Sequence, residues 1–261
     1  MNRLGIHFAN QQWDKPSEDS FRLLAMCKPS LIKTCLHNQC GYTQIDVYRR
    51  LRAEHPDAKI IARLMGNGFD FNEYYGLVHY LFNIERLVNA FEIGNEPNHP
   101  VEWDKGLNEW LGWFHGFLTE WRGDRLLGKV PVVFPGMAVR YDIPGASPQE
   151  WYSRCRDAMA RCDLIGVHCY WQGDDNIYSE QWGQLYRYVY GLIRKDIVVT
   201  EVGDSTKHRS SVEKATRYVK WASMLPKYII GSAAFILGGT EDWKEQGFDI
   251  DETACKVIGH G

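Results

Sequence analysis

Two glutamates follow short apolar segments, and their side chains suit acid–base chemistry. The apolar segment at residues 90–93 leads into Glu96, and the segment at residues 197–200 leads into Glu201. Cleavage of a glycosidic bond needs two carboxyl groups, one to protonate the leaving oxygen and one to attack or stabilise the anomeric carbon. A separation of about 5–5.5 Å permits direct attack with retention of configuration, and a wider gap admits water and gives inversion. Glu96 and Glu201 therefore form a candidate catalytic pair.

Both glutamates belong to a regular alternation of short apolar runs and longer amphipathic patterns. Eight runs are predicted to be strands: Leu4–Phe8, Leu31–Cys35, Lys59–Leu64, Ala90–Ile93, Val130–Phe134, Leu164–Cys169, Ile197–Thr200 and Ile229–Leu237. The intervals between them are each long enough for one strand–helix unit. Parallel strands of such units place their carboxyl ends at one face, where barrel active sites lie.

The intervening segments carry helix signals. An apolar stripe with helical spacing runs from Leu107 to Trp121, and Ser210 with Glu213 forms a capping box before another stripe. We therefore predict an α/β fold, a single (β/α)8 TIM barrel formed by residues 1–261. An open doubly wound sheet is the alternative, but residues 8–12 lack the glycine-rich loop that usually follows its first strand.

Composition narrows the classes of partner. The chain has 261 residues, 24% of them charged, and a formal net charge of -3, which disfavours a nucleic-acid partner. Its apolar runs are shorter than the roughly 18 residues that a membrane span needs. The N-terminal residues lack the pattern of a secretory signal, so we expect cytoplasmic synthesis, with action there or on an extracellular glycan after release. A monomer is expected.

The motifs around the two glutamates resemble those of a known group. Phe-Glu-Ile-Gly-Asn-Glu-Pro at residues 91–97 resembles the acid/base motif of clan A glycoside hydrolases, which include β-glucosidases, cellulases and mannanases. Val-Val-Thr-Glu-Val-Gly at residues 198–203 resembles the nucleophile strand of that clan. The resemblance implies a (β/α)8 barrel that retains anomeric configuration without a cofactor. Glu96 would be the acid/base, and Glu201 would carry a covalent glycosyl group.

The same resemblance implies further roles in substrate binding. Asn95 would bind the sugar 2-hydroxyl, and Trp243 would form the floor under the reacting sugar. His168 and Tyr170 match a His-x-Tyr pattern on the sixth strand. Tyr170 would be the partner of the nucleophile, and His168 would line the sugar site.

Other candidate residues are identified by their positions near strand ends. Lys33 and Arg63 interrupt apolar strands, where either cation could orient a carboxylate or form a structural ion pair beneath the site. His7 either lines the site or is structural, and the same alternatives hold for His168. Trp171 is either a sugar platform or a packing residue, since indole rings serve both purposes.

Three classes of function remain in competition. The leading hypothesis is a retaining glycosidase acting on a β-linked polysaccharide or oligosaccharide, in intracellular glycan processing or in the lysis of a cell wall or capsule. The alternative is a carbohydrate-binding protein on an inactive barrel, which predicts that one carboxylate is missing. A metal-dependent hydrolase is disfavoured, because the first strand lacks the His-x-His pattern and no metal ligand set is predicted.

Overall fold

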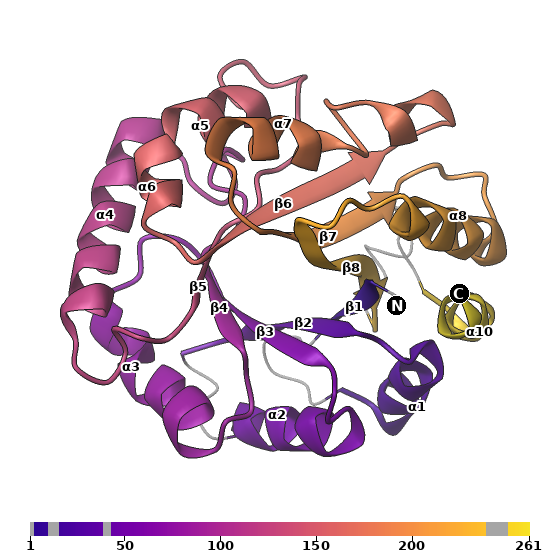
Figure 1. Cartoon of the computed structure of the whole chain (residues 1–261), viewed down its shortest axis with the longest axis horizontal. Coiled ribbons are helices and arrows are strands. Elements are labelled where there is room, and N and C mark those ends of the chain that lie inside the picture. Colours follow the sequence, from indigo (N-terminus) through magenta and orange to yellow (C-terminus); the bar gives the residue numbers. More distant parts are fainter. Residues whose placement is uncertain (1–2, 10–15, 39–42, 239–249) are drawn as a thin grey trace.

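The chain forms a closed barrel of eight parallel strands in sequential order (Figure 1). The computed structural model describes residues 3–9, 16–38, 43–238 and 250–261. The strands are β1 Leu4–Phe8, β2 Leu31–Leu36, β3 Lys59–Leu64, β4 Ala90–Ile93, β5 Val132–Phe134, β6 Leu164–Trp171, β7 Ile197–Asp204 and β8 Ile229–Leu237. Pairing of β1 with β8 closes the barrel. The predicted (β/α)8 fold is thus confirmed.

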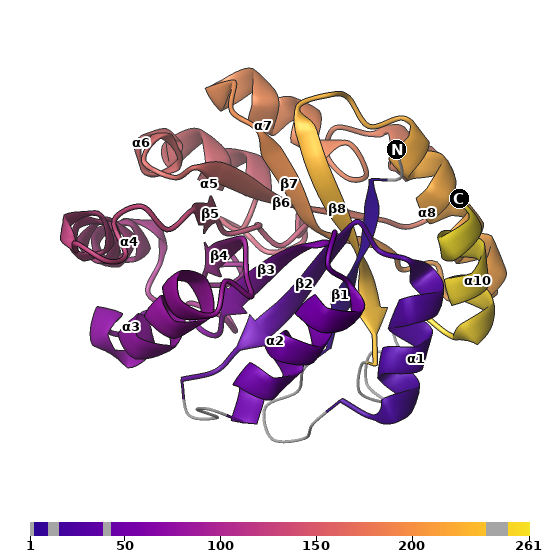
Figure 2. The ribbon, with the colours of Figure 1, turned by 60° about the horizontal axis from the view of Figure 1, so that its bottom comes forward.

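Helices surround the barrel on its outside (Figures 1 and 2). They are α1 Glu18–Cys27, α2 Thr43–Glu54, α3 Phe71–His79, α4 Leu107–Gly123, α5 Pro148–Arg154, α6 Arg156–Ala160, α7 Leu185–Ile193, α8 Ser211–Ser223 and α10 Glu252–His260, with a π-helical turn η1 at Tyr80–Ile84 and a 3-10 turn η2 at Asp175–Tyr178. The predicted capping box of Ser210 and Glu213 begins α8. Within the described residues, none of the helices has the length and apolarity that a bilayer span requires.

Side-chain alternation along the strands divides the interior into two regions. Outward-facing residues pack against the helices in the main core. Six inward-facing residues form a small apolar floor inside the barrel: Leu31, Ile61, Ala90, Val133, Val198 and Ala233. Two residues further along three of these strands come Lys33, Arg63 and Glu92, all buried. A polar layer therefore lies directly above the apolar floor, towards the carboxyl ends of the strands.

Strand limits differ from the predicted ones mainly in β6 and β7. Both strands continue beyond their apolar runs, because Cys169, Tyr170 and Trp171 pair in register with Val202, Gly203 and Asp204. Strand pairing uses backbone hydrogen bonds, which polar residues form as well as apolar ones. Apolar runs alone therefore underestimate the strand length. Glu201 consequently lies within β7 and not after its end.

Candidate active site

A β-bulge turns the Glu201 side chain into the barrel. Val199 pairs with Val167, and Glu201 pairs with His168, so Thr200 is an extra residue in β7. Strict alternation from the inward-facing Val198 would direct Glu201 outward, but one extra residue reverses the side to which the following side chains point. Val202 then packs in the outer core, and Glu201 lies in the polar layer with 3% of its surface exposed.

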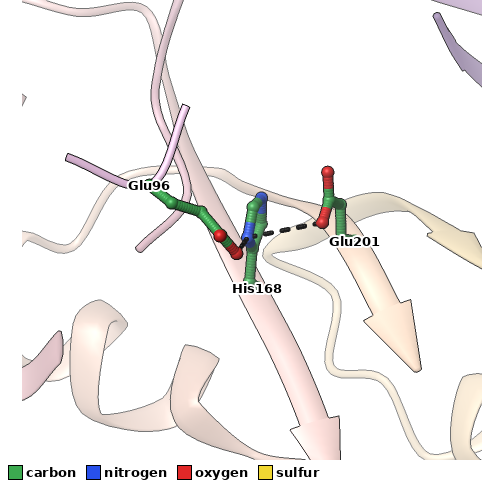
Figure 3. Close-up of side chains that lie close together, drawn as sticks. All are labelled: Glu96, His168 and Glu201. Atoms are coloured by element: carbon green, nitrogen blue, oxygen red, sulfur yellow. Dashed lines mark hydrogen bonds and ion pairs between the residues drawn. The ribbon is translucent and has the colours of Figure 1, made fainter. Parts of the chain in front are cut away.

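Glu96 follows β4 in a sharply turned loop. Its φ angle is 35°, in the left-handed region, and its backbone N–H donates to the Gly136 carbonyl at 3.1 Å. The His168 Nδ1 atom lies 2.8 Å from Glu96 Oε1 and 3.6 Å from Glu201 Oε2. Figure 3 shows the imidazole ring between the two carboxylates. Carboxylate oxygens of Glu96 and Glu201 and a nitrogen of His168 all lie within 4.8 Å of one another.

Three donors from three strands contact the Glu201 carboxylate. Lys33 Nζ donates to Oε1 at 3.0 Å, and Arg63 Nη1 donates to the same oxygen at 3.3 Å. The Tyr170 hydroxyl donates to Oε2 at 2.6 Å. Both oxygens are therefore held, and a short charge-assisted hydrogen bond is stronger than a neutral one.

Local charges keep Glu201 ionised despite its burial. Burial alone would raise the pKa of its carboxyl, yet the charges of His168 and Lys33 hold this pKa well below the ordinary value. His7 contributes as well, with Nδ1 3.3 Å from Oε1. Burial lowers the pKa of His7 itself to about 4, so this imidazole is neutral at pH 7. An ionised carboxylate in this position suits a nucleophile.

A buried ion pair supports the Glu201 carboxylate from below. Lys33 Nζ lies 2.8 Å from Glu92 Oε2, and both side chains are almost completely buried. Burial opposes ionisation of Glu92, but Lys33 holds its pKa below the ordinary value. Lys33 thus lies between two carboxylates, on β4 and β7. Glu92 was not predicted as a site residue, although its inward position two residues after Ala90 is a signal that strand alternation offers.

Both the oxygen and the nitrogen of the Asn95 side-chain amide form hydrogen bonds. Arg63 Nη1 donates to its Oδ1 at 2.7 Å, and its Nδ2 donates to Glu102 Oε1 at 2.8 Å. Asn67 Nδ2 donates to its carbonyl oxygen at 2.7 Å. The sequence did not single out Asn67 or Glu102, because loop residues carry no periodic signal. The expected contact of Asn95 with a sugar hydroxyl stays a prediction.

Gly136 makes room for His168. A Cβ atom at this position would lie 2.1 Å from Cδ2 of the imidazole, which is closer than any real contact. The His168 ring is fully buried against this backbone. Glycine therefore allows the ring to lie beside Glu96. The structure brings the predicted residues Tyr170, Lys33, Arg63 and His7 to Glu201, and His168 to both glutamates, while their roles in substrate binding stay predictions.

Trp171 is a correction to the predicted site. Its side chain is 1% exposed and packs in the outer core, with the Tyr218 ring centroid 5.8 Å away and the Trp221 centroid 6.0 Å away. Alternation along β6 directs His168 and Tyr170 inward, so Trp171 faces α8 and not the site. Trp243 lies outside the described residues.

The spacing of Glu96, His168 and Glu201 is also compatible with a metal ion. The charges around Glu201 oppose this use, because the ammonium of Lys33 and the guanidinium of Arg63 already contact Oε1 of the same carboxylate whose Oε2 lies near His168. Two fixed positive charges repel a further cation at such short range. The arrangement fits proton transfer and nucleophilic attack better.

Comparisons with known proteins identify similar folds. A scan against protein-family models finds no match, and a search of the curated proteins finds none either. Among solved structures, a GH128 subgroup II endo-β-1,3-glucanase from Sorangium cellulosum has a TM-score of 0.67 at 16% identity, covering 98% of this chain and 97% of its own. A subgroup I endo-β-1,3-glucanase from Amycolatopsis mediterranei, in complex with laminarihexaose, has a TM-score of 0.61 at 16% identity and 99% coverage of both chains.

A third GH128 endo-β-1,3-glucanase, from Pseudomonas viridiflava, has a TM-score of 0.60 at 15% identity, covering 90% of this chain and 86% of its own. GH128 lies in clan A, the group whose motifs the sequence resembles. At these identities the likeness is one of fold. The protein therefore has the (β/α)8 barrel fold of clan A glycoside hydrolases, and GH128 endo-β-1,3-glucanases are among the structures similar to it.

Proposed function

We propose that the protein is a retaining glycoside hydrolase that cleaves β-1,3-glucan within the chain. The observation that carries this proposal is the pair of carboxylates, Glu96 after β4 and Glu201 in β7, with oxygens within 4.8 Å of each other. This separation is close to the roughly 5–5.5 Å of retaining pairs and shorter than the roughly 6.5–9.5 Å of inverting pairs, so it favours direct attack. The substrate class rests on the similar structures, which are described as endo-β-1,3-glucanases.

In the first step, Glu96 donates its proton to the glycosidic oxygen while a Glu201 oxygen attacks the anomeric carbon. The carbon–oxygen bond to the leaving chain breaks, and an ester between Glu201 and the sugar forms. Tyr170 and Lys33 orient the attacking carboxylate. Before this step Lys33 and Arg63 balance the charges of Glu92 and Glu201. When Glu201 becomes neutral in the ester, Glu96 has lost its proton and carries the negative charge instead.

In the second step, Glu96 acts as a base. It takes a proton from water, the water oxygen bonds to the anomeric carbon, and the ester to Glu201 breaks. His168 Nδ1 lies 2.8 Å from Glu96, so the carboxyl group is held in place through both steps. The product keeps the β configuration, because two inversions occur.

The first test uses the purified protein with β-1,3-glucan, β-1,4-glucan, peptidoglycan and bacterial capsule, following new reducing ends. We expect cleavage of β-1,3-glucan and a loss of at least about a thousandfold in rate for Glu201→Gln, as removal of an essential catalytic group usually causes. Glu120→Gln is the matched control, because Glu120 is exposed on α4 away from the site. NMR of the fresh product should show the β anomer, and an α product would exclude double displacement.

A second measurement separates the roles of the two glutamates. An aryl β-glucoside with an acidic phenol needs no proton on its leaving oxygen, so Glu96→Gln should slow its first step far less than Glu201→Gln does. Equal losses on this substrate would contradict the assignment of Glu96 as the acid. If the wild-type protein cuts no glycan but binds one, the barrel is a carbohydrate-binding module instead.

A further inference from the structure

A second hollow lies beside the active site on the same face of the barrel. It has a volume of about 630 Å³ and is bounded by the loops at residues 67–68 and 100–105 and by Glu109 and Trp113 of α4. These loops follow β3 and β4, whose carboxyl ends carry Arg63 and Glu96. The volume falls within the range of roughly 300–1,000 Å³ that is usual for ligand sites.

We propose that this hollow binds a further stretch of the glycan chain whose cleavage occurs at Glu96 and Glu201. The proposal rests on the proposed function and extends it to the length of substrate that the protein recognises. Three features of the described residues support it: the connection of the hollow to the active site, the chemistry of its walls and the rigid setting of its aromatic rings.

Glu102 connects the hollow with the catalytic residues. It lines the hollow, and its carboxylate accepts a hydrogen bond from Asn95 Nδ2 at 2.8 Å. Its backbone carbonyl accepts from Asn67 Nδ2 at 3.3 Å, and Asn67 also lines the hollow. The lining of the hollow is therefore in direct contact with Asn95, the residue that precedes Glu96.

The walls combine carboxylates with indole rings. Glu102, Asp104 and Glu109 provide negative charge against the ammonium of Lys105, so an anionic ligand such as a phosphate or nucleic acid would be repelled. An apolar ligand would take water from Asp104 and Glu109 and offer them no hydrogen bond in return, which is costly. A neutral ligand rich in hydroxyl groups satisfies both conditions, because hydroxyls donate to carboxylates while C–H faces pack on indole.

The aromatic rings are held in fixed positions. Trp103 Nε1 donates to the Gly106 carbonyl at 2.8 Å, and Trp113 Nε1 donates to the Phe69 carbonyl at 2.9 Å. Their ring centroids lie 6.3 Å apart with an interplanar angle of 29°. Lys105 Nζ lies 5.4 Å from the Trp103 ring centroid, and the Lys105 side chain is exposed. A sugar ring that stacks on Trp103 would replace the exposed Lys105 ammonium over the indole, while the hydrogen bond of Trp103 to Gly106 is kept.

The experiment compares a short and a long substrate. We measure kcat/KM on β-1,3-glucan oligosaccharides of about three and about eight glucosyl units for wild type, Trp103→Ala and Glu109→Gln. The ratio of kcat/KM for the long to the short substrate should fall roughly tenfold for Trp103→Ala, the loss expected for one aromatic stacking contact. A smaller fall is expected for Glu109→Gln, and none for Glu120→Gln on the same helix.

Binding to an inactive protein provides a readout that does not depend on turnover. Calorimetry with the long oligosaccharide compares Glu201→Gln with the double variants that add Trp103→Ala or Glu109→Gln, and we expect weaker binding in both. Unchanged ratios and unchanged affinities would overturn the proposal. If Trp103→Ala does not fold, Glu109→Gln decides, because Glu109 is exposed. A wild-type protein that cuts neither oligosaccharide would instead refute the proposed function.

Discussion

Glu96 holds a backbone conformation that glutamate rarely adopts. Its φ of 35° is costly for any residue with a Cβ atom, by roughly 1–2 kcal/mol. The hydrogen bond from its N–H to Gly136 and the contact of its carboxylate with His168 hold it there. Strained backbone of this kind is frequent at functional sites, where contacts with the surrounding structure offset the energetic cost of the strained conformation.

This strain predicts the relative stability of two inactive variants. Glu96→Gly should have a free energy of unfolding about 1 kcal/mol higher than Glu96→Ala, because glycine adopts positive φ without steric cost. Both variants lack the carboxyl group, so the comparison isolates the backbone. Urea denaturation at pH 7 measures the difference. An alanine variant at least as stable as the glycine variant would contradict the strained conformation.

Lys33 shows how a buried charge is tolerated at this site. Its ammonium is completely buried, but it lies 2.8 Å from Glu92 and 3.0 Å from Glu201. Removal of one member of such a group leaves an unpaired buried charge, which is far more costly than the loss of an exposed ion pair. The group therefore fixes the Glu201 carboxylate in place and makes its ionised state the stable one.

Alternation along β6 places one of two adjacent residues in the candidate site and the other in the outer core. Tyr170 faces the barrel interior and donates to Glu201, whereas its neighbour Trp171 faces α8 in the outer core. In the same way, the extra residue Thr200 in β7 brings Glu201 to the inner side. The elements thus decide which of two adjacent residues faces the candidate site.

Substitution of these two neighbours should have opposite consequences. Tyr170→Phe removes a hydrogen bond to a charged group, so kcat/KM should fall roughly ten- to hundredfold, and the free energy of unfolding should fall by less than in Trp171→Ala. Trp171→Ala should lower that free energy by about 3–5 kcal/mol through a core cavity. Its kcat should stay near the wild-type value under conditions where it is folded. Parallel assays of activity and urea denaturation test this, and a reversed pattern would refute the assignment of the two faces.

At the scale of the whole molecule, the buried polar layer makes stability depend on pH. His7 has a pKa of about 4 when folded and about 6.5 when unfolded, because burial disfavours its charged form. Between these values the unfolded chain binds more protons, so stability falls as pH decreases from 6.5 to 4. Glu92 and Glu201 have depressed pKa values when folded. Their contribution is present above the unfolded value of 4.5 and is lost as pH falls below it.

The His7 contribution can be measured by substitution. Between pH 7 and pH 5, the free energy of unfolding of the wild type should fall by about 2 kcal/mol more than that of His7→Gln, as follows from the two pKa values of this group. Urea denaturation of both proteins at the two pH values provides the comparison. Equal decreases would mean that His7 is not buried in its neutral form.

The sequence by itself determined the fold class and the two central residues of the candidate site. Eight apolar runs separated by amphipathic segments predicted the (β/α)8 barrel, because the period of apolar residues reports which face of each element is buried. Motifs around Glu96 and Glu201 singled out these carboxylates, and parallel strands bring their carboxyl ends to one face. Local pattern was sufficient for these conclusions, since each depends on residues close together in the chain.

Only the tertiary structure decided which side chains meet. The ion pair of Lys33 with Glu92 joins strands separated by many residues, and the contact of Glu102 with Asn95 arises from a loop without periodicity. The outward position of Trp171 and the inward position of Glu201 follow from strand register and from the bulge at Thr200. Register and bulges are set by pairing with neighbouring strands, and one residue of slip reverses every side chain. These contacts therefore depend on closure of the whole barrel.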